Sequence, residues 1–313
     1  MVFDRRVARS LRAGESAVVG SYGASMQSFR RCKRARMLCL LDYPISHHRW
    51  SREILAEEAE REPEFAETLQ YHRFTPSEEA QLDEEIQLAN QILVLSTFQK
   101  RTFVEAGVDE VKLSVVPLGV DLDLFQPRPR APDDDVFRII FVGQITQRKG
   151  LSYLLKGFER AAIPNTELLL VGKPVGSTKS WALRPGVRHK AHEPRARLPE
   201  IYRNADVMVL PSIVEGFGLT ALEAMASGLP VIVSENTFGS DVITDGVDGY
   251  VVPIRDADAI AERFRTLWSD RSLRSTIGDA ARRRAETFSW EAYGRRGVEV
   301  IRDALARRDL QLA

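Results

Sequence analysis

The sequence predicts an α/β protein of two domains, each built on a parallel sheet with helices between the strands. Short apolar runs alternate with charged helical stretches along almost the whole chain, which is typical of parallel sheets. The length of 313 residues favours two domains. A proline-rich stretch without helical period, 117–135, separates two such regions. We therefore expect a first domain over 1–120, a linker over 121–136 and a second domain over 137–289.

The composition is that of an ordinary globular protein, with 44% hydrophobic and 28% charged residues. Forty-four basic residues balance 44 acidic ones, so no overall field attracts nucleic acid. Cys32 and Cys39 form no CxxC pattern, which argues against a zinc site and a disulfide framework. No apolar run approaches the roughly 18 residues that a membrane span needs. Residues 1–16 are too charged for a signal-peptide core, and we expect a cytoplasmic protein.

One local charge feature qualifies this expectation. Five basic residues lie within seven positions: Arg30, Arg31, Lys33, Arg34 and Arg36. A solvated helix face is the simpler interpretation. The alternative is a patch that makes peripheral contact with the inner face of a membrane.

In the first domain, four buried runs are predicted strands. They are Ser16–Gly20, Met37–Leu41, Gln91–Leu95 and Leu113–Val116. The acidic stretch 53–67 predicts an exposed helix face. A helix is predicted over 77–88, with Ser77 as its N-cap before the glutamates, and another over 96–107.

The second domain repeats this alternation and is predicted to be doubly wound and Rossmann-like. Its predicted strands are Phe137–Val142, Glu167–Val171, Val187–Lys190, Val207–Leu210, Val231–Val233 and Tyr250–Val252. Its main predicted helices are 151–162, 257–268 and 272–287. Ligands of such sheets bind at the carboxyl ends of the strands, so residues that follow a strand are the first candidates for a site.

The most informative stretch is LPSIVEGFGLTALEAMASGLPVIVS, 210–234. A strand ends at Leu210, and a glycine-containing turn opens a helix near Phe217. The amides left without helical partners are those of Gly218, Leu219 and Thr220. Unpaired donors at the positive end of a helix dipole form an anion site, and Gly216 and Gly218 would let a phosphate approach the backbone.

Seven residues separate Glu215 on this turn from Glu223 on the helix. Within EGFGLTALEAMASGLPVI, this spacing resembles the signature of retaining glycosyltransferases of family 4, which have the GT-B fold of two Rossmann-like domains facing a cleft. The resemblance runs from about Phe3 to Ala304 and is strongest over 137–253. An incidental glutamate pair on a surface helix is the simpler alternative, but the surrounding motif argues against it.

The resemblance implies transfer of a sugar from a nucleotide-diphosphate-sugar donor to an acceptor, with retention at the anomeric carbon. It implies that Glu215 contacts hydroxyls of the donor sugar and that Glu223 accepts hydrogen bonds from the ribose. The two oxygens of a carboxylate suit a pair of adjacent hydroxyls. The implied donor-binding residues are Gly143, Gly172, Gly216, Phe217, Gly218, Leu219, Thr220 and Glu223.

A second element, FVGQITQRKG at 141–150, follows the first strand of the second domain and should face the same crevice. Arg148 and Lys149 would bind a pyrophosphate, because two cations at a helix start are unfavourable without an anion. Many relatives have an arginine directly after the loop glycine. Here that position is Gln144, so the guanidinium role falls to Arg148. With Glu215, these two cations are the predicted catalytic residues.

Four other features receive weaker or structural roles. Lys173, after a strand, either lines the nucleotide pocket or is only solvated. Asp241 stands where relatives usually carry glutamate, and we expect it to be structural or peripheral. Two DxD triplets, Asp121–Asp123 and Asp256–Asp258, could be interpreted as the metal-binding motif of the other large glycosyltransferase fold. They lie in the linker and at a helix start, however, rather than at strand ends. We therefore expect no catalytic metal and no cofactor.

The first domain is the expected acceptor side. Tyr22 follows its first predicted strand, and Asp42 and His47 follow the second. His48 is an alternative to His47, and exposed loop residues are the simpler interpretation of all four. The acceptor would be a sugar, a polysaccharide or a lipid-linked compound.

This domain lacks the opening strand and glycine-rich loop with which the family begins, as though an upstream segment were absent. A helix over 290–307 resembles the family's last helix, so we assign 290–313 to a segment that crosses back to the first domain. Three apolar residues of this helix keep helical spacing, Val298, Ile301 and Leu305. We expect that 127–288 folds and binds nucleotide, and that this chain alone transfers sugar poorly. The alternatives are a truncated, non-catalytic nucleotide-sugar-binding protein or subunit and, less well supported, a nucleotide-sugar epimerase.

Overall fold

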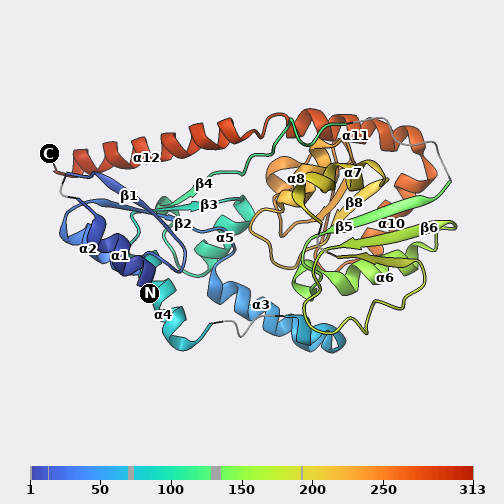
Figure 1. The fold of residues 1–313 in the computed structure, drawn as a ribbon, viewed down its shortest axis with the longest axis horizontal. Helices are drawn as coiled ribbons and strands as arrows, with labels where there is room; N and C mark the ends of the chain where they lie inside the picture. The colour runs from blue at the N-terminus through green and yellow to red at the C-terminus, as the bar shows by residue number, and fades with distance from the viewer. Residues whose placement is uncertain (1, 13, 70–73, 128–134, 192, 313) are drawn as a thin grey trace.

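Two parallel sheets form the framework of the protein. The computed structural model describes residues 2–12, 14–69, 74–127, 135–191 and 193–312. The first sheet has four strands and the second has six. Figure 1 shows them at opposite ends of an elongated molecule, the first on the left and the second on the right. The predicted α/β class is confirmed.

The first sheet has the strand order β1-β2-β3-β4, all parallel. Its strands are β1 (Ala17–Ser21), β2 (Leu38–Asp42), β3 (Gln91–Val94) and β4 (Leu113–Val115), each within one residue or two of its predicted bounds. The helices α1 (Val2–Ser10), α2 (Met26–Arg34), α4 (Pro76–Leu88) and α5 (Thr97–Glu105) belong to this half. Phe29 of α2, Ile86 of α4 and Phe103 of α5 share one buried cluster with Ile92 and Val94 of β3.

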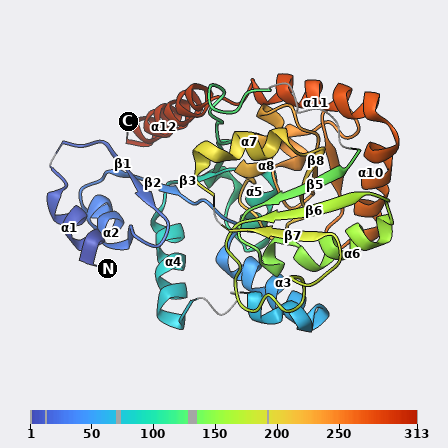
Figure 2. The ribbon, with the colours of Figure 1, turned by 45° about the vertical axis from the view of Figure 1, so that its right-hand side comes forward.

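The long helix α12 (Trp290–Leu312) covers the other face of this sheet, as Figures 1 and 2 show. Ala304, Ile301 and Leu305 pack against Leu38 and Leu40 of β2. Val298, which helical spacing predicted on this contact, is instead 45% exposed. The prediction for Val298 was wrong because the contact face of the helix runs through Tyr293, Val300 and Ala304, and Val298 lies to one side of it.

The start of α4 differs from the prediction. Its N-cap is Thr75 rather than Ser77, because Pro76 has no amide hydrogen to pair and suits the first helical position. The Thr75 hydroxyl accepts a hydrogen bond from Glu78 N at 3.3 Å, and the Glu78 carboxylate accepts one from Thr75 N at 2.8 Å. This capping box satisfies two helix-end donors at once.

The basic cluster lies on α2 and the turn after it. Its residues are exposed, and three of them make polar contacts, among them Arg31, whose Nη2 donates to Leu11 O at 3.4 Å. Arg30 pairs with Glu84 of α4, and Lys33 Nζ donates to Asn90 Oδ1 at 2.9 Å. No described helix is both long and apolar enough to cross a membrane.

The second sheet has the strand order β10-β9-β8-β5-β6-β7. Its strands are β5 (Phe137–Val142), β6 (Thr166–Val171), β7 (Val187–Lys190), β8 (Val207–Leu210), β9 (Val231–Ser234) and β10 (Tyr250–Val252). The chain leaves β5 in one direction and returns at β8 on the other side. A crevice therefore opens at the carboxyl ends of β5 and β8, where doubly wound sheets bind their ligands.

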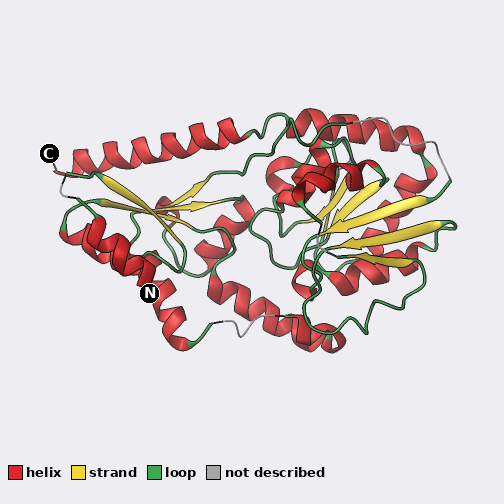
Figure 3. Cartoon of the chain, viewed as in Figure 1, coloured by secondary structure: helices red, strands yellow, loops and turns green. Residues whose placement is uncertain are grey.

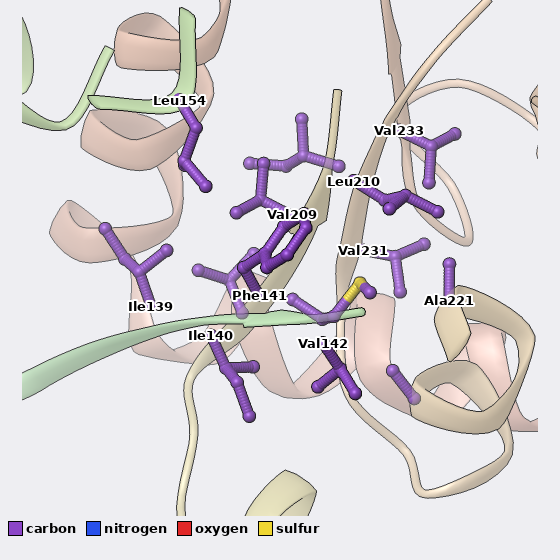
Figure 4. Close-up of a cluster of buried hydrophobic side chains, with 14 of the residues drawn as sticks. Ile139, Ile140, Phe141, Val142, Leu154, Val209, Leu210, Ala221, Val231 and Val233 are labelled. Atoms are coloured by element: carbon purple, nitrogen blue, oxygen red, sulfur yellow. The ribbon is translucent and has the colours of Figure 1, made fainter. Parts of the chain in front are cut away.

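Helices cover both faces of this sheet, as Figure 3 shows. The helices α6 (Leu151–Ala161) and α10 (Ala257–Ser269) pack together, and so do α8 (Leu219–Ala226) and α11 (Arg271–Ala285). Figure 4 shows the core between them, with apolar side chains of β5, β8, β9, α6 and α8 in contact. Each fully buried Val, Leu, Ile or Phe contributes roughly 1.5–3 kcal/mol, which fixes the strand ends that carry the crevice.

One segment, which lies between β2 and β3 in the sequence, packs on both halves: its start contacts α5 of the first half, and its later part lies in the core of the second sheet. It comprises α3 (His48–Arg61) and the 3-10 helix η1 (Pro63–Thr68). Leu55, Phe65 and Leu69 belong to the core of the second sheet. The acidic stretch is therefore more than an exposed helix face, since Glu58 is 0% exposed. A fragment of 127–288 would lack these contacts.

The linker is described only in part. Before its middle, Asp121 Oδ1 accepts a hydrogen bond from Leu124 N at 2.9 Å, and Phe125 is fully buried. Its residues 128–134 lie outside the described residues.

Two helical glycines give a test of the packing of α11. A Cβ at Gly278 would lie 2.3 Å from the carbonyl oxygen of Gly228, whereas one at Gly297 of α12 would meet nothing within 4 Å. Alanine is favoured over glycine inside a helix by about 1 kcal/mol. We expect Gly297→Ala to raise the free energy of unfolding by about 0.5–1 kcal/mol, and Gly278→Ala to lower it by about 1–3 kcal/mol through overpacking. Urea denaturation measures both, and a stabilising Gly278→Ala would contradict the close approach.

Candidate functional site

The loops that follow β5 and β6 touch at two glycines. Gly143 and Gly172 have φ values of +151° and +144°, and a Cβ at Gly172 would lie 1.8 Å from Gly143 O. Gly143 N also donates a hydrogen bond to Val171 O at 2.9 Å. Only glycine permits this approach. The structure thus gives Gly172 a packing reason and Gly143 a conformational one, its positive φ, since a Cβ at Gly143 would meet no atom closer than 3.7 Å.

The β5 loop is joined to the loop after β8. The 3-10 helix η3 (Gln147–Lys149) ends at Gly150, where a Cβ would lie 2.0 Å from Pro211 O. Ile213 N donates to Arg148 O at 2.9 Å, and Arg148 Nη1 donates to Val214 O at 2.8 Å. These contacts fix the predicted cations beside Glu215.

Three predicted catalytic side chains meet at this junction. Lys149 Nζ forms a direct ion pair with Glu215 Oε2, and Arg148 Nη1 lies 3.8 Å from the same oxygen. Lys149 is 8% exposed, and the Glu215 side chain is 14% exposed. Two cations and one carboxylate leave one net positive charge, which favours an anion beside them.

Burial and charge act in opposite directions on these groups. Burial raises the pKa of the Glu215 carboxyl, but Lys149 and Arg148 outweigh it and hold the pKa below its ordinary value. Burial also lowers the pKa of Lys149, although the Glu215 charge opposes this. Glu215 is therefore ionised at neutral pH and serves as the counterion of the buried ammonium.

The turn that carries Glu215 is held by the first half of the protein. Ser46 Oγ donates to Glu215 O at 3.1 Å, and Ser96 Oγ donates to Gly216 O at 2.8 Å. A Cβ at Gly216 would lie 2.0 Å from Pro44 O. Glycine at this position is thus required by the neighbouring backbone, whereas the sequence analysis explained it by the approach of a phosphate.

The start of α8 offers donors to the crevice. Gly218, with φ of +105°, is the N-cap, and α8 has no side-chain cap. Its first amides therefore have no partner within the helix. Thr220 Oγ1 is buried and has no hydrogen-bond partner among the described residues. Phe217, predicted to bind the donor, instead packs in the core against Phe238 with ring centroids 5.1 Å apart.

The second glutamate of the motif has its own cation. Glu223 is 3% exposed, and its Oε1 accepts a hydrogen bond from Arg195 Nε at 3.1 Å. Burial raises the pKa of Glu223 above its ordinary value, although Arg195 opposes the rise. The Tyr202 hydroxyl beside it donates to Thr220 O at 3.0 Å. Sequence reasoning missed Arg195, which the basic stretch PRAR directly before α7 (Leu198–Arg203) could have suggested.

A cavity of about 110 Å³ lies between the two halves, next to Arg148. From the first half it is lined mainly by Tyr22, Ile45, His48, Arg52 and Phe74, and from the second by Gln144, Arg148 and Val214. Sequence reasoning named Tyr22 but missed Arg52 and Phe74. Both lie far from any strand end, which was the only signal available for the first domain.

Two predicted acceptor-side residues lie elsewhere. His47 is 3% exposed, caps α3 by accepting a hydrogen bond from Arg49 N, and does not line the cavity. Burial lowers the pKa of His47 to about 3, so its ring is neutral at neutral pH. Asp42 ends β2 on the side of α12, where its charge adds to burial in raising the pKa of Tyr293. His48, the alternative to His47, is the histidine that lines the cavity.

His47, His48 and Asp83 bring three potential metal-ligating atoms within 4.8 Å of one another. The Asp83 carboxylate is already paired with the Arg49 guanidinium. A metal ion would have to compete with this cation, so we assign the cluster no metal. Asp256 of a DxD triplet is the N-cap of α10.

The remaining candidates have structural or solvent positions. Asp241 Oδ2 accepts a hydrogen bond from Thr97 N at 2.8 Å and so caps α5 of the first half. The Lys173 side chain is exposed, and the Lys173 carbonyl oxygen accepts a hydrogen bond from Ile145 N at 2.9 Å. Asp241 is therefore structural, as expected.

Residues 124–284 match the family model of the glycosyl transferases group 1. The chain belongs to this family. It is 35% identical to the MMP alpha-(1->4)-mannosyltransferase of Mycolicibacterium hassiacum over 71% of this chain and 56% of that protein. It is 32% identical to the D-inositol 3-phosphate glycosyltransferase of Kribbella flavida over 63% of this chain and 52% of that protein. The chain thus spans little more than half the length of these curated relatives.

Solved structures share its fold. The sucrose-phosphate synthase of Thermosynechococcus elongatus matches with a TM-score of 0.75 and 25% identity, over 97% of this chain and 78% of that one. Anabaena HepE, solved with UDP-glucose, matches with a TM-score of 0.70 and 16% identity, over 92% and 79%. The family and the GT-B fold inferred from the glutamate motif are confirmed.

The buried ion pair at the junction can be tested through stability. Glu215→Gln would leave Lys149 buried without a full counterion, so we expect the free energy of unfolding to fall by about 3 kcal/mol. The control is Glu286→Gln, which removes an exposed i,i+4 partner of Arg282 and should change it by less than about 1 kcal/mol. Chemical denaturation without ligand measures both. If the two substitutions lowered the free energy of unfolding equally, burial of the Lys149 ammonium would not depend on Glu215 as its counterion.

Proposed function

We propose that this protein transfers a sugar from a nucleotide-diphosphate-sugar donor to an acceptor with retention of the anomeric configuration. The observation that carries the proposal is the anion site at the crevice. Arg148 and Lys149 pair with Glu215, which comes four residues before the uncapped start of α8 at Leu219, and the buried Thr220 hydroxyl at that start has no hydrogen-bond partner among the described residues. A diphosphate would supply acceptors for all of these donors.

The two glutamates suit the two ends of such a donor. Glu223 lies two residues after the Leu219–Ala221 turn of α8, and its second carboxylate oxygen can accept from a ribose diol while Arg195 bonds the first. Glu215 faces the diphosphate cations and can accept from hydroxyls of the donor sugar. Membership of the family supports both roles.

The chemistry then follows from the charges. The bond between the anomeric carbon and the phosphate oxygen breaks, the bond to the acceptor oxygen forms on the same face, and the acceptor proton passes to a phosphate oxygen. Negative charge grows on the departing diphosphate, which Arg148, Lys149 and the α8 amides would stabilise. Preorganised cations and dipoles of this kind lower the barrier without reorganisation.

The acceptor is proposed to enter the cavity between the two halves. Arg148 borders both this cavity and the junction, so an acceptor there would lie next to the anomeric carbon. Tyr22 and Phe74, with ring centroids 6.3 Å apart, offer apolar faces to a sugar ring. The named relatives act on different acceptors, so we propose only the class of a sugar, a polysaccharide or a lipid-linked compound.

The donor site can be tested by calorimetry with UDP, GDP and ADP and with the matching nucleosides. Arg148→Ala and Lys149→Ala should each weaken nucleoside-diphosphate binding about 10- to 100-fold, the value of a hydrogen bond to a charged group. Glu223→Gln should weaken binding of both the nucleoside diphosphate and the nucleoside, because both contain the ribose. The control Lys173→Ala, an exposed cation, should change neither affinity. Unchanged diphosphate binding in both cation variants would contradict the assignment.

The reaction is also expected to need no metal, because cations and amides of the protein meet the phosphate charge. Product formation from a radiolabelled nucleotide-sugar should be the same with and without EDTA. A loss in EDTA that added Mn²⁺ restores would contradict this. Donor binding without transfer to any acceptor would favour the non-catalytic binding protein.

A further inference from the structure

A carboxylate shielded from water lies on α3, next to the loop that carries the two cations. Glu58 is 0% exposed. Its Oε2 accepts a hydrogen bond from Arg255 Nε at 2.7 Å, and its Oε1 accepts one from Gln147 Nε2 at 2.7 Å. A buried charge is costly unless it is paired and hydrogen-bonded, and both oxygens of Glu58 meet this condition.

Gln147 is fixed by a full set of hydrogen bonds. Its Nε2 also donates to Ser152 Oγ at 2.6 Å, its Oε1 accepts from Ser152 N at 2.8 Å, and its backbone N donates to Thr68 Oγ1 at 2.8 Å. Gln147 is itself fully buried and directly precedes Arg148 and Lys149 in η3. Because Gln147 is the first residue of η3, its hydrogen bonds fix the position of the backbone that carries Arg148 and Lys149.

Arg255 reaches Glu58 from the loop after β10 at a conformational cost. Its φ is +65°, a left-handed conformation that is unfavourable for arginine. Its guanidinium also bonds Glu57 at 3.2 and 3.3 Å. Such backbone strain persists only where surrounding contacts determine it, and here those contacts are the two glutamates of α3.

We propose that Glu58 is a positioning residue for donor binding. From α3 it holds Gln147, and through Gln147 it holds η3, so that Arg148 and Lys149 meet the diphosphate together. The inference rests on the proposed function, since it assigns the cations to that ligand. It also explains why a helix that follows a strand of the first sheet is packed into the second half.

The hydrogen-bond pattern offers a reciprocal test. Glu58→Gln leaves one acceptor for two donors, so the new amide faces either Arg255 or Gln147 with hydrogens on both sides. Gln147→Glu places two carboxylates together. The double variant Glu58→Gln/Gln147→Glu restores the pattern, because the new amide accepts from Arg255 and donates to the new carboxylate, which still accepts from Ser152.

The experiment measures two affinities by calorimetry, for the tightest of UDP, GDP and ADP and for its nucleoside. Glu58→Gln should weaken diphosphate binding about tenfold or more, because small displacements of binding groups are costly. The affinity for the nucleoside should stay unchanged. The double variant should recover most of the loss. Glu57→Gln is the matched control, because Glu57 also bonds Arg255 but its side chain is 45% exposed and forms no hydrogen bond with Gln147 among the described residues. The diphosphate affinity of this control should equal that of the wild type.

The outcomes distinguish failure of the positioning role of Glu58 from failure of the proposed function. If Glu58→Gln weakens both ligands equally, or neither, Glu58 only supports the fold and the inference is overturned. If Glu58→Gln does not fold, Gln147→Glu and the double variant carry the test: a selective diphosphate loss in Gln147→Glu that the double variant recovers supports the inference, and a loss that remains in the double variant overturns it. If the wild type binds none of the three diphosphates, the proposed function itself fails.

Discussion

The burial of a lysine ammonium beside a glutamate carboxylate, where the loops after β5 and β8 cross, is the constraint on which the site depends. Removing both charges from water costs several kcal/mol per ion, which only close pairing and further hydrogen bonds offset. The backbone around Lys149 and Glu215 is built for this closeness. Gly150 lies against Pro211, and Gly143 lies against Gly172, at distances that no Cβ would tolerate. These glycines thus allow the close backbone contacts that bring Lys149 and Glu215 together, in addition to any space that they leave for a ligand.

The first half of the protein completes this junction. Hydroxyls of Ser46 and Ser96 bond the carbonyl groups of the turn that carries Glu215. Asp241 of the second half in turn caps α5 of the first. Each half therefore satisfies polar groups that the other leaves open, and buried polar groups without partners are costly. The geometry of the site is a property of the interface between the halves, which explains why the cavity between the halves and the charged junction share Arg148.

The strands could be predicted from the sequence because each is an apolar run with turn residues at its ends, and the glutamate motif marked the strand-to-helix turn directly. Glu58 could not be predicted, since an acidic helix looks solvated until its partners Arg255 and Gln147, far away in sequence, are known. The choice between His47 and His48 also depended on tertiary structure. They are neighbours at the start of α3, and only the direction of the helix decides which one reaches the cavity.

The two glutamates of the motif show how the same side chain acquires a different pKa at two positions eight residues apart. Glu215 faces two cations in a buried junction, which hold its pKa below the ordinary value. Glu223 is more deeply buried but faces one arginine, and its pKa is raised. As the pH falls, Glu223 therefore takes up a proton before Glu215. The contribution of Glu215 to stability is present above its unfolded pKa and is lost only as the pH falls through the lower, folded value. In the roles proposed above, an ionised Glu215 would keep Lys149 charged for a phosphate, and Glu223 would keep an oxygen available for neutral hydroxyls. The environments rather than the residue type would then divide the two roles.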